Sequence, residues 1–280
     1  MNLAALHTFQ AIVETGSLIR ASERLNVTQS TVTARLKALE EDIGQPLFLR
    51  QKSGARLTAA GAKFRRYADA MIALWGQAKQ DAGLPEGVGA VCNIGCHQDL
   101  WPNLGARALT TIQEAPTTTA ITAWPCEAGQ VDEWLTAGLI DLAFTHRATT
   151  SVGATSYRLP DDRLILVSTD PNAPLRHDPG YVFVDAGEAF GRAHHVTYAD
   201  ADTAQLSFGA ADWALAHITK RGGTAYLPER VAEKALADGV LSLVSDAPVF
   251  SRPVWMIVRD DAVTSWPWFD RLAKAMKVTP

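Results

Sequence analysis

Apolar residues recur at the three- and four-residue spacing of a helix in three short segments near the start of the chain. The stripes are Leu6, Phe9 and Val13, then Leu18, Ala21 and Leu25, then Val32, Leu36, Leu39 and Ile43. They predict three amphipathic helices. Gly16 and Gly44 stand where the first and third helices should end. Ser17 and Thr28 can cap the second and third, and a tight turn at Asn26–Val27 makes this pair a helix-turn-helix.

The other face of the third predicted helix carries amide, hydroxyl and cationic side chains. Such groups can read the edges of base pairs and hold backbone phosphates. The expected DNA contacts in and before this helix are Ser17, Arg20, Thr28, Gln29, Ser30, Thr31, Thr33, Arg35 and Lys37. The alternative is a small helical bundle whose polar face is only solvated.

A polar segment, QKSGAR, follows from Gln51 to Arg56. With Gly54 at its turn and apolar residues on either side, it predicts a two-stranded wing. Arg50, Lys52 and Arg56 can then reach backbone phosphate or the minor groove. An ordinary solvated hairpin is the alternative, but three cations beside a recognition helix favour DNA.

A long helix is predicted from Thr58, which can cap it, to about Asp81. Its apolar residues step by three and four over several turns, which is the spacing of a coiled-coil seam. The expected dimerisation residues are Phe64, Tyr67, Met71, Leu74, Trp75 and Ala78. We therefore expect this helix to pair with its copy in a second chain, the alternative being a helix packed on its own domain.

Beyond a segment rich in Gly and Pro at residues 83–89, apolar strands alternate with helices. The predicted strands are Ala90–Ile94, Thr119–Ala123, Asp141–Phe144, Leu164–Val167, Tyr181–Val184 and Val254–Val258. The predicted helices lie near residues 100–113, 131–137, 210–220, 229–237 and 266–276. This alternation predicts an α/β region with open parallel sheets that helices cover on both faces.

Polar and aromatic side chains follow the predicted strands. In such sheets ligands bind beyond the C-terminal ends of the strands, where the strand order reverses. The candidate effector-binding residues are Cys96, His97, Gln98, Trp124, Thr145, His146, Arg147, Ser168, Tyr198, Thr224 and Tyr226. Imidazoles, an arginine and aromatic walls suit a small carboxylate, so an organic acid is a candidate effector.

Charge divides the chain at the same place as the pattern does. Residues 1–82 hold 11 Lys and Arg against 7 Asp and Glu, a net charge of +4, whereas the remaining 198 residues hold 15 against 23, a net charge of −8. A basic module on an acidic body is typical of a nucleic-acid-binding protein. The sequence predicts no signal peptide and no apolar run of the ~20 residues that span a bilayer, so we expect a cytoplasmic protein.

Catalytic motifs such as GxxxxGK, GxSxG and HExxH are missing from the sequence, so we expect neither an enzyme nor a cofactor. His194 and His195 are adjacent, and sequence neighbours seldom point at one metal, so no metal site is predicted. Cys92, Cys96 and Cys126 are too few for a disulfide framework. Cys96 and Cys126 are read as small packing residues, and a thiol redox switch between them stays open as an alternative.

Taken in order, these segments resemble the LysR-type transcriptional regulators. The matching N-terminal segments are Phe9–Ser17, Ala21–Ser30, Leu39–Gly44, Leu47–Arg50 and Leu57–Gly61. Looser matches follow at Asn93–Gly95, Leu135–Phe144, Asp162–Val167 and Gly222–Pro228, while residues 178–202 are not aligned. Ile19, Thr31 and Ala34 depart from the residues more usual in the family, which should change the site that is read and not whether DNA is bound.

The resemblance implies an α/β protein with an all-α N-terminal part. Its expected parts are a winged helix-turn-helix DNA-binding domain (1–57), a linker and dimerisation helix (58–82), a hinge (83–89) and an effector domain of the two-lobed, type 2 periplasmic-binding-protein fold (90–280). Lobe I is expected at about 90–167 and 250–280, and lobe II at about 168–249.

The same resemblance implies a transcriptional regulator that assembles as a homodimer or homotetramer on double-stranded DNA. A small molecule that closes the two lobes would change the arrangement of the subunits and the bending of the bound DNA. Two alternatives stay open: a thiol redox-sensing regulator of the same family, and an enzyme on the two-lobed fold.

Overall fold

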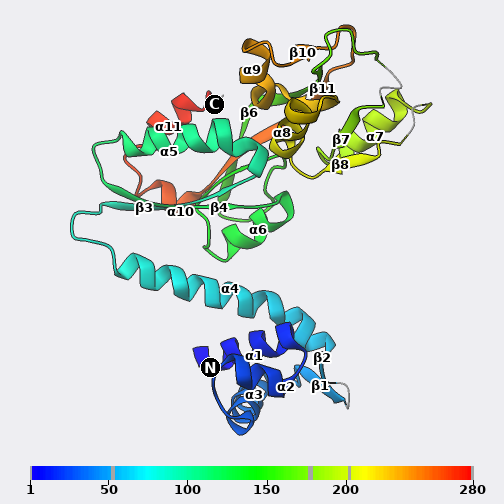
Figure 1. Ribbon diagram of the computed structural model, residues 1–280. Helices are drawn as coiled ribbons and strands as arrows, with labels where there is room; N and C mark the ends of the chain where they lie inside the picture. Colours follow the sequence, from blue (N-terminus) through cyan, green and yellow to red (C-terminus); the bar gives the residue numbers. More distant parts are fainter. Residues whose placement is uncertain (1, 52–53, 176–178, 201–202, 279–280) are drawn as a thin grey trace. The chain divides into compact units, whose positions relative to one another are not determined.

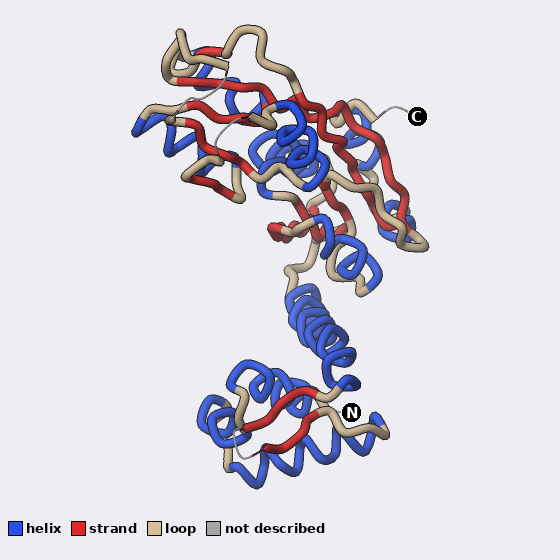
Figure 2. The backbone as a smooth tube through the Cα atoms, turned by 90° about the vertical axis from the view of Figure 1, so that its right-hand side faces the viewer, coloured by secondary structure: helices blue, strands red, loops and turns tan. Residues whose placement is uncertain are grey.

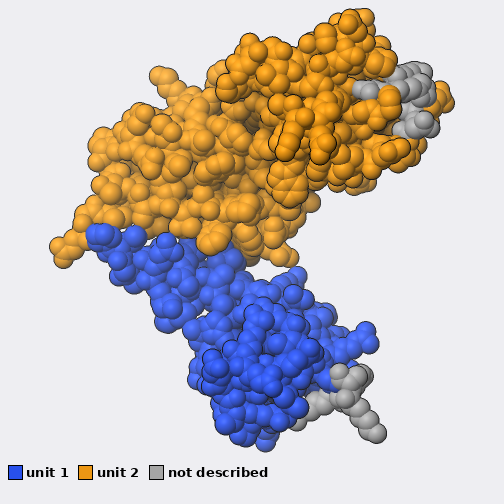
Figure 3. All heavy atoms as spheres, in the orientation of Figure 1, with its two compact units in different colours: residues 1–85, 137–139 blue, residues 86–136, 140–280 orange. Residues whose placement is uncertain are grey.

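The computed structural model describes residues 2–51, 54–175, 179–200 and 203–278 (Figure 1). The chain divides into two compact units, residues 1–85 with 137–139 and residues 86–136 with 140–280 (Figure 3). The first unit holds the residues predicted to bind DNA, and the second holds those predicted to bind an effector.

The first unit consists of helices and a two-stranded wing, as the sequence predicts. Its elements are α1 (Leu3–Thr15), α2 (Leu18–Arg24), α3 (Gln29–Ile43), β1 (Phe48–Gln51), β2 (Gly54–Leu57) and α4 (Ala59–Ala82). Figure 2 shows the wing as two red strands beside the helices. The predicted caps are confirmed, because the side chains of Ser17, Thr28 and Thr58 accept backbone N–H groups at the starts of α2, α3 and α4.

Phe9 lies at the centre of the core of this unit. Its buried ring lies 5.2 Å from the ring of Phe48 on β1 and 5.2 Å from the ring of Phe64 on α4. The wing and the start of α4 therefore pack on the same core as the apolar stripes of α1 and α3. Burial of these stripes leaves the polar face of α3 outside the core.

Main-chain hydrogen bonds fix the wing on the helices. The N–H of Ala55 on β2 donates to the carbonyl oxygen of Gly16 at 2.8 Å. Gly54 approaches the same oxygen so closely that a Cβ atom there would stand 2.4 Å from it. At the start of the other strand, the Glu40 carboxylate of α3 accepts the N–H of Phe48 at 3.2 Å and that of the preceding Leu47 at 2.6 Å. The wing is thus held both to Gly16, which follows α1, and to α3.

A mixed sheet carries the second unit, and within the described residues its order is β4-β3-β5-β11-β6-β9-β7-β8, with β10 paired to β6. The strands are β3 (Ala90–Cys96), β4 (Thr119–Pro125), β5 (Leu142–Thr145), β6 (Ala154–Ser168), β7 (Tyr181–Val184), β8 (Leu206–Phe208), β9 (Thr224–Pro228), β10 (Ser242–Leu243) and β11 (Phe250–Arg259). The helical segments are η1 (Gln98–Leu100), η2 (Trp101–Gly105), α5 (Ala106–Gln113), α6 (Ala128–Thr136), α7 (Glu188–Thr197), α8 (Ala211–Arg221), α9 (Glu229–Ala237), α10 (Asp260–Val263) and α11 (Phe269–Ala275).

Two long antiparallel strands, β6 and β11, join lobe I to lobe II. Along Trp255–Val258, β11 pairs with β5 of lobe I, and along Leu164–Ser168, β6 pairs with β9 of lobe II. The pairs of β3 with β4 and β5, and of β7 with β8 and β9, are parallel. The expected α/β architecture is confirmed, but the sheet is mixed and not parallel throughout, because the chain crosses between the lobes in both directions.

Helices cover both faces of the sheet in lobe I. α5 and α11 pack on the face that carries Cys92, Ile94 and Met256, and α6 packs on the other face. The α-helix predicted at 100–113 begins only at Ala106, because Pro102 lies in the preceding π-helical turn. α7 lies in the segment where the sequence predicted no helix. No helix of the described residues is long and apolar enough to cross a membrane.

Candidate nucleic-acid interface and effector site

The exposed face of α3 is built by its cap and its buried stripe. The Thr28 hydroxyl accepts the N–H of Thr31 at 3.2 Å and also hydrogen-bonds the Ser30 hydroxyl at 2.8 Å. Val32 and Leu36 turn inward and are buried. Thr28 thus acts first on the helix itself, and it fixes the start of the face that carries the predicted base-reading residues.

The predicted base-reading and phosphate-binding residues of α2 and α3 lie outside the core. Gln29, Ser30, Arg20 and Lys37 are exposed, and Thr31, Thr33 and Arg35 are half-buried. Ser17 is also half-buried, because its hydroxyl accepts the N–H of Arg20 at 3.4 Å. All the sequence-predicted residues of these two helices therefore lie outside the buried core of the first unit.

Some cations of the first unit form ion pairs with carboxylates of the same unit, and others do not. Lys37 lies 3.5 Å from the Glu41 carboxylate. Arg20, Arg35 and Arg56, by contrast, have no ion pair with any residue that the structure describes. Unpaired guanidinium groups are free to hold phosphate oxygens in bidentate fashion.

Two further predicted cations belong to the wing. Arg50 lies on β1, where it faces Ala55 of β2 in the strand register, and Lys52 lies outside the described residues. Arg56 is exposed on β2. The sequence did not reveal the role of Glu40, whose carboxylate accepts the main-chain N–H groups at the start of β1. The available signal was an acidic residue near the end of a helix that was predicted to bind DNA.

The predicted dimerisation residues of α4 divide into two groups. Phe64 and Met71 pack against the core of their own unit. Tyr67 is 54% exposed, Leu74 is 42% exposed and Trp75 is 51% exposed, and Ala78 is exposed as well. The sequence predicted one dimerisation surface along α4. In the structure, part of these residues pack in the core of their own unit, and the others form an outer apolar surface.

In lobe I, two imidazoles meet where β3 and β5 end. The rings of His97 and His146 lie edge to face with their centroids 4.8 Å apart. The carbonyl oxygen of Pro253, 2.9 Å from Nδ1 of His146, can only accept, so Nδ1 carries the hydrogen and Nε2 is an acceptor. Burial lowers the pKa of His146 to about 2 and lowers that of His97 as well. Both rings are therefore mainly neutral near pH 7.

Three buried polar atoms beside this pair lack a hydrogen-bond partner among the described residues. They are Oγ1 of Thr145, Nε2 of His146 and Nε of Arg252. Thr145 and His146 end β5, and Arg252 precedes the proline that His146 contacts. Because unsatisfied buried polar groups are rare and costly, each of these atoms is a place where one more hydrogen bond would be favourable.

The two lobes are joined beside the imidazole pair. Nε2 of Gln98 donates to the carbonyl oxygen of Gly209 at 3.0 Å, and the N–H of Ala211, at the start of α8, donates to the Asp99 carboxylate at 3.1 Å. Asp99 also lies 3.3 Å from Arg252. Gln98 was predicted from the sequence, whereas Asp99, Gly209, Ala211 and Arg252 were missed.

A chain of buried charges continues from this contact. Nη2 of Arg252 lies 2.8 Å from the Asp162 carboxylate, which also pairs with Arg230 of α9 at 2.6 Å. Asp99, Arg252 and Asp162 are all buried. Alternating signs let these groups neutralise one another without water.

Other predicted effector residues do not join the imidazole pair. The Arg147 side chain is 60% exposed, donates to the carbonyl oxygen of Ala128 at 3.2 Å and lies 3.8 Å from Asp132. Trp124 is 53% exposed on β4, the outermost strand of lobe I. Neither side chain is held toward His97 or His146, so an anion there would need a different cation.

Two predicted residues of lobe II, Ser168 and Thr224, lie at the strand ends that are away from the crossover. Thr224 begins β9 instead of following it. In the strand register it pairs with Ser168, the last residue of β6, whereas the pair next to the crossover is Leu164 with Pro228, four residues away. Ser168 and Thr224 hydrogen-bond each other at 3.0 Å. The edge of lobe II that meets lobe I is instead formed after β8, at Gly209–Ala211.

Tyr198 and Tyr226 also meet each other and not the imidazole pair. Their hydroxyl groups lie 2.6 Å apart, and the Tyr226 hydroxyl donates to the carbonyl oxygen of Pro248 at 3.0 Å. Tyr226 is buried in mid-strand. His194 packs beside both rings, and its Nε2 lies 2.7 Å from the Tyr181 hydroxyl. These side chains build the aromatic core of lobe II.

The cysteines are buried and lie in separate cores. Cys96 shares one face of β3 with Cys92, whereas a Cβ atom at Gly95, on the opposite face, would stand 3.1 Å from Sγ of Cys126. Burial raises the pKa of the Cys96 thiol and raises that of Cys126 to about 12. Reactive thiols are exposed and easily deprotonated, so this arrangement favours packing over a redox switch. Within the described residues no His, Cys, Asp and Glu cluster suited to a metal occurs.

Comparisons with known proteins point to one family. Residues 3–62 match the family model described as bacterial regulatory helix-turn-helix protein, lysR family. The HTH-type transcriptional regulator HdfR of Escherichia coli (strain SMS-3-5 / SECEC) is 29% identical over 261 residues, which cover 92% of this chain and 91% of HdfR.

Solved structures share the fold. Full-length CbnR in complex with its target DNA has a TM-score of 0.69 at 20% identity, with 99% of each chain covered. DarR of Vibrio fischeri in complex with DNA has a TM-score of 0.60 at 18% identity, with 97% of this chain and 98% of DarR covered. Residues 3–62 thus carry the helix-turn-helix of the lysR family, and over nearly its whole length the chain is similar to an HTH-type transcriptional regulator.

Proposed function

We propose that α3 enters the major groove of double-stranded DNA and reads it with Gln29, Thr33 and Arg35. The observation that carries this proposal is the polar outer face of α3. In the same unit Arg20 and Arg56 are exposed and have no ion-pair partner among the described residues. A surface that replaces the counterions of DNA needs unpaired cations of this kind. In this proposal the wing, fixed by the main-chain hydrogen bond from Ala55 to Gly16 and by the Glu40 carboxylate of α3, holds the phosphate backbone.

The effector is proposed to bind between the imidazole pair of lobe I and residues 209–211 of lobe II. Nε2 of His146 and Oγ1 of Thr145 offer an acceptor and a hydroxyl, and Nε of Arg252 offers a donor. A small polar molecule with both donor and acceptor groups would satisfy all three. An organic acid fits if its carboxylate accepts from Arg252, which takes the place that the sequence gave to Arg147.

Assembly is proposed to use the outer apolar surface of α4, formed by Tyr67, Leu74, Trp75 and Ala78. A second copy packed on this surface would remove these side chains from water and place two α3 helices on one DNA molecule. The site of action is the cytoplasm, where bacterial promoters are.

Footprinting of the DNA that flanks the gene for this chain tests the proposed function. The full-length protein should protect two half-sites one helical turn apart, or a multiple of it. A double variant, Gln29→Ala with Arg35→Gln, should lose this protection, whereas Lys79→Gln, which removes an exposed cation near the end of α4, should keep it. Unchanged protection by the double variant would contradict the assignment of α3.

A further inference from the structure

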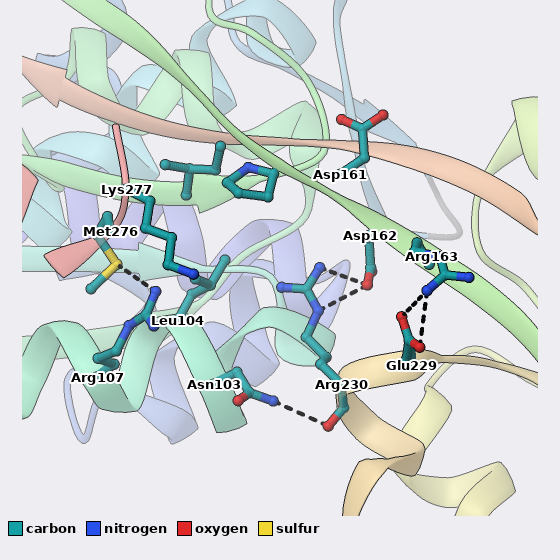
Figure 4. Close-up of a pocket in the computed structure, with 12 residues that line it drawn as sticks. Asn103, Leu104, Arg107, Asp161, Asp162, Arg163, Glu229, Arg230, Met276 and Lys277 are labelled. Atoms are coloured by element: carbon teal, nitrogen blue, oxygen red, sulfur yellow. Dashed lines mark hydrogen bonds and ion pairs between the residues drawn. The ribbon is translucent and has the colours of Figure 1, made fainter. Parts of the chain in front are cut away.

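A pocket of about 230 Å³ opens on the second unit, and neither His97 nor His146 lines it (Figure 4). It lies where the first turns of α5 and the residues after α11 face the crossover of β6 and the start of α9. None of the residues proposed above to bind the effector lines it. The pocket is smaller than the roughly 300–1,000 Å³ of sites for drug-sized ligands, so it suits a small molecule.

The carboxylates that line this pocket are already neutralised. Each of the three has a guanidinium partner: Asp161 with Arg158, Asp162 with Arg230 at 2.6 Å, and Glu229 with Arg163 at 2.9 Å. These acids therefore leave little negative charge for the other cations at the pocket.

Two cations of the pocket have no such partner. Nη2 of Arg107 donates to Sδ of Met276 at 3.9 Å, and neither Arg107 nor Lys277 forms an ion pair with a described residue. Figure 4 shows the guanidinium of Arg107 and the amine of Lys277 on the same side of the pocket, beside Leu104. Two positive groups thus converge on a space that the protein leaves unfilled.

We propose that this pocket is a second ligand site, which binds a small organic anion through Arg107 and Lys277. The planar guanidinium can hold two oxygens of a carboxylate or phosphate group, and the flexible amine can add a third contact. Leu104, Leu159 and Met276 form an apolar wall that suits a short hydrocarbon body.

The position of the pocket places such an anion between the lobes on the side of α5 and α9. Arg107 belongs to lobe I, whereas Arg230 lies in the first turn of α9 of lobe II. Asn103, just before α5, already donates to the carbonyl oxygen of Arg230 at 3.2 Å across this boundary. The bound anion would therefore rest on both lobes without touching the proposed effector site.

Titration calorimetry on the full-length protein tests this site, in a buffer of low salt that contains neither carboxylate nor phosphate. Succinate and inorganic phosphate serve as separate probes. Saturable binding of at least one of the two anions is expected. If the apolar wall contributes to binding, succinate should bind and inorganic phosphate should not. Arg107→Gln and Lys277→Gln should each weaken the binding about tenfold or more, as expected for the loss of a charge-assisted hydrogen bond.

Lys274→Gln is the matched control, because it removes an exposed cation from α11 that does not line the pocket. It should bind the anion as the wild type does. The proposal is overturned if neither probe binds saturably, or if the three variants lose affinity equally. It is also overturned if Arg107→Gln with Lys277→Gln changes the molar mass in light scattering, because the cations would then serve a contact between copies. None of these readouts depends on DNA, so they stand apart from the proposed function.

Discussion

The outer surface of the first unit and the interior of the second unit use charge in opposite ways. In the first, Arg20, Arg35 and Arg56 lie at the surface without an ion-pair partner in the described part of the chain. In the second, Arg252 is buried and lies within 3.3 Å of Asp99 and 2.8 Å of Asp162. A surface that meets a polyanion must leave its cations unpaired, whereas a buried charge must be paired to be tolerated. Adding a charge to the apolar surface of the first unit should therefore disrupt its assembly. Removing a charge from the interior of the second unit should lower its stability.

Adding a charge to the outer surface of α4 should have the largest effect. Leu74→Asp would bury a carboxylate, and its copy, in the proposed interface between two α4 helices. An unpaired buried charge costs several kcal/mol per ion, enough to separate a dimer held by a short seam. Light scattering at micromolar concentration should report about half the mass of the wild-type assembly.

Leu74 suits this test better than Met71, which also packs in the core of its own unit. Leu74→Met, which keeps an apolar side chain of similar size, is the matched control and should leave the mass unchanged. A wild-type mass for Leu74→Asp would show that α4 is not the interface.

Removing a charge from the second unit should have the next largest effect. Arg252→Met leaves Asp99 and Asp162 buried beside an apolar side chain. We expect the free energy of unfolding to fall by about 3–5 kcal/mol, measured by urea denaturation. Arg163→Met removes the exposed partner of Glu229 and should cost less than about 1 kcal/mol. Equal losses in the two variants would contradict the role given to the buried pairs.

The neutral imidazole of His146 makes the stability of the second unit depend on pH. Its pKa is lowered from 6.5 to about 2 by burial, so the unfolded chain binds a proton below pH 6.5 and the folded chain does not. Stability should therefore fall as the pH falls, by about 1.4 kcal/mol per pH unit, or about 2 kcal/mol from pH 6.5 to pH 5. His146→Gln, compared with the wild type in urea at both pH values, should lose most of this slope.

The His146→Gln comparison must separate the titration of His146 from its hydrogen bond and from the titration of His97. The amide of the glutamine can still donate to the carbonyl oxygen of Pro253, so the variant removes the titration more than the contact. His97 also has a lowered pKa, because burial disfavours its charged form, and should leave a slope of the same sign in both proteins. An identical pH dependence in the variant and the wild type would mean that His146 is protonated in the folded protein.

The first unit could be predicted from the sequence because its contacts are local. The stripe of α3, the caps at Ser17 and Thr28 and the turn at Gly54 are each read from neighbours within a few residues. The same argument was incomplete for α4, since the packing of Phe64 on Phe9 joins residues far apart in the sequence.

The proposed effector site could be predicted only in part, because it depends on contacts between distant segments. Strand ends at Cys96 and Thr145 located His97 and His146, but Asp99 and Arg252 are 153 residues apart in the sequence, and no local pattern joins them. Thr224 was misplaced because a short apolar strand does not reveal from its sequence which of its ends faces the other lobe. The side chain of Arg147 is exposed and lies near Asp132 on α6. The two residues are 15 positions apart, and no sequence pattern predicted that they would be neighbours.

DNA binding measured as a function of both sequence and salt tests the central claim most directly. On duplexes selected by the wild-type protein and on random duplexes, Gln29→Ala should narrow the difference in binding free energy by about 1–3 kcal/mol, because a base contact is lost. Arg56→Gln should weaken both duplexes alike and reduce the salt slope by about one, because a phosphate contact is lost. Lys79→Gln is the control and should change neither quantity. If Gln29→Ala and Arg56→Gln both kept the wild-type affinity, discrimination and salt slope, α3 and the wing would not be the surface that reads DNA.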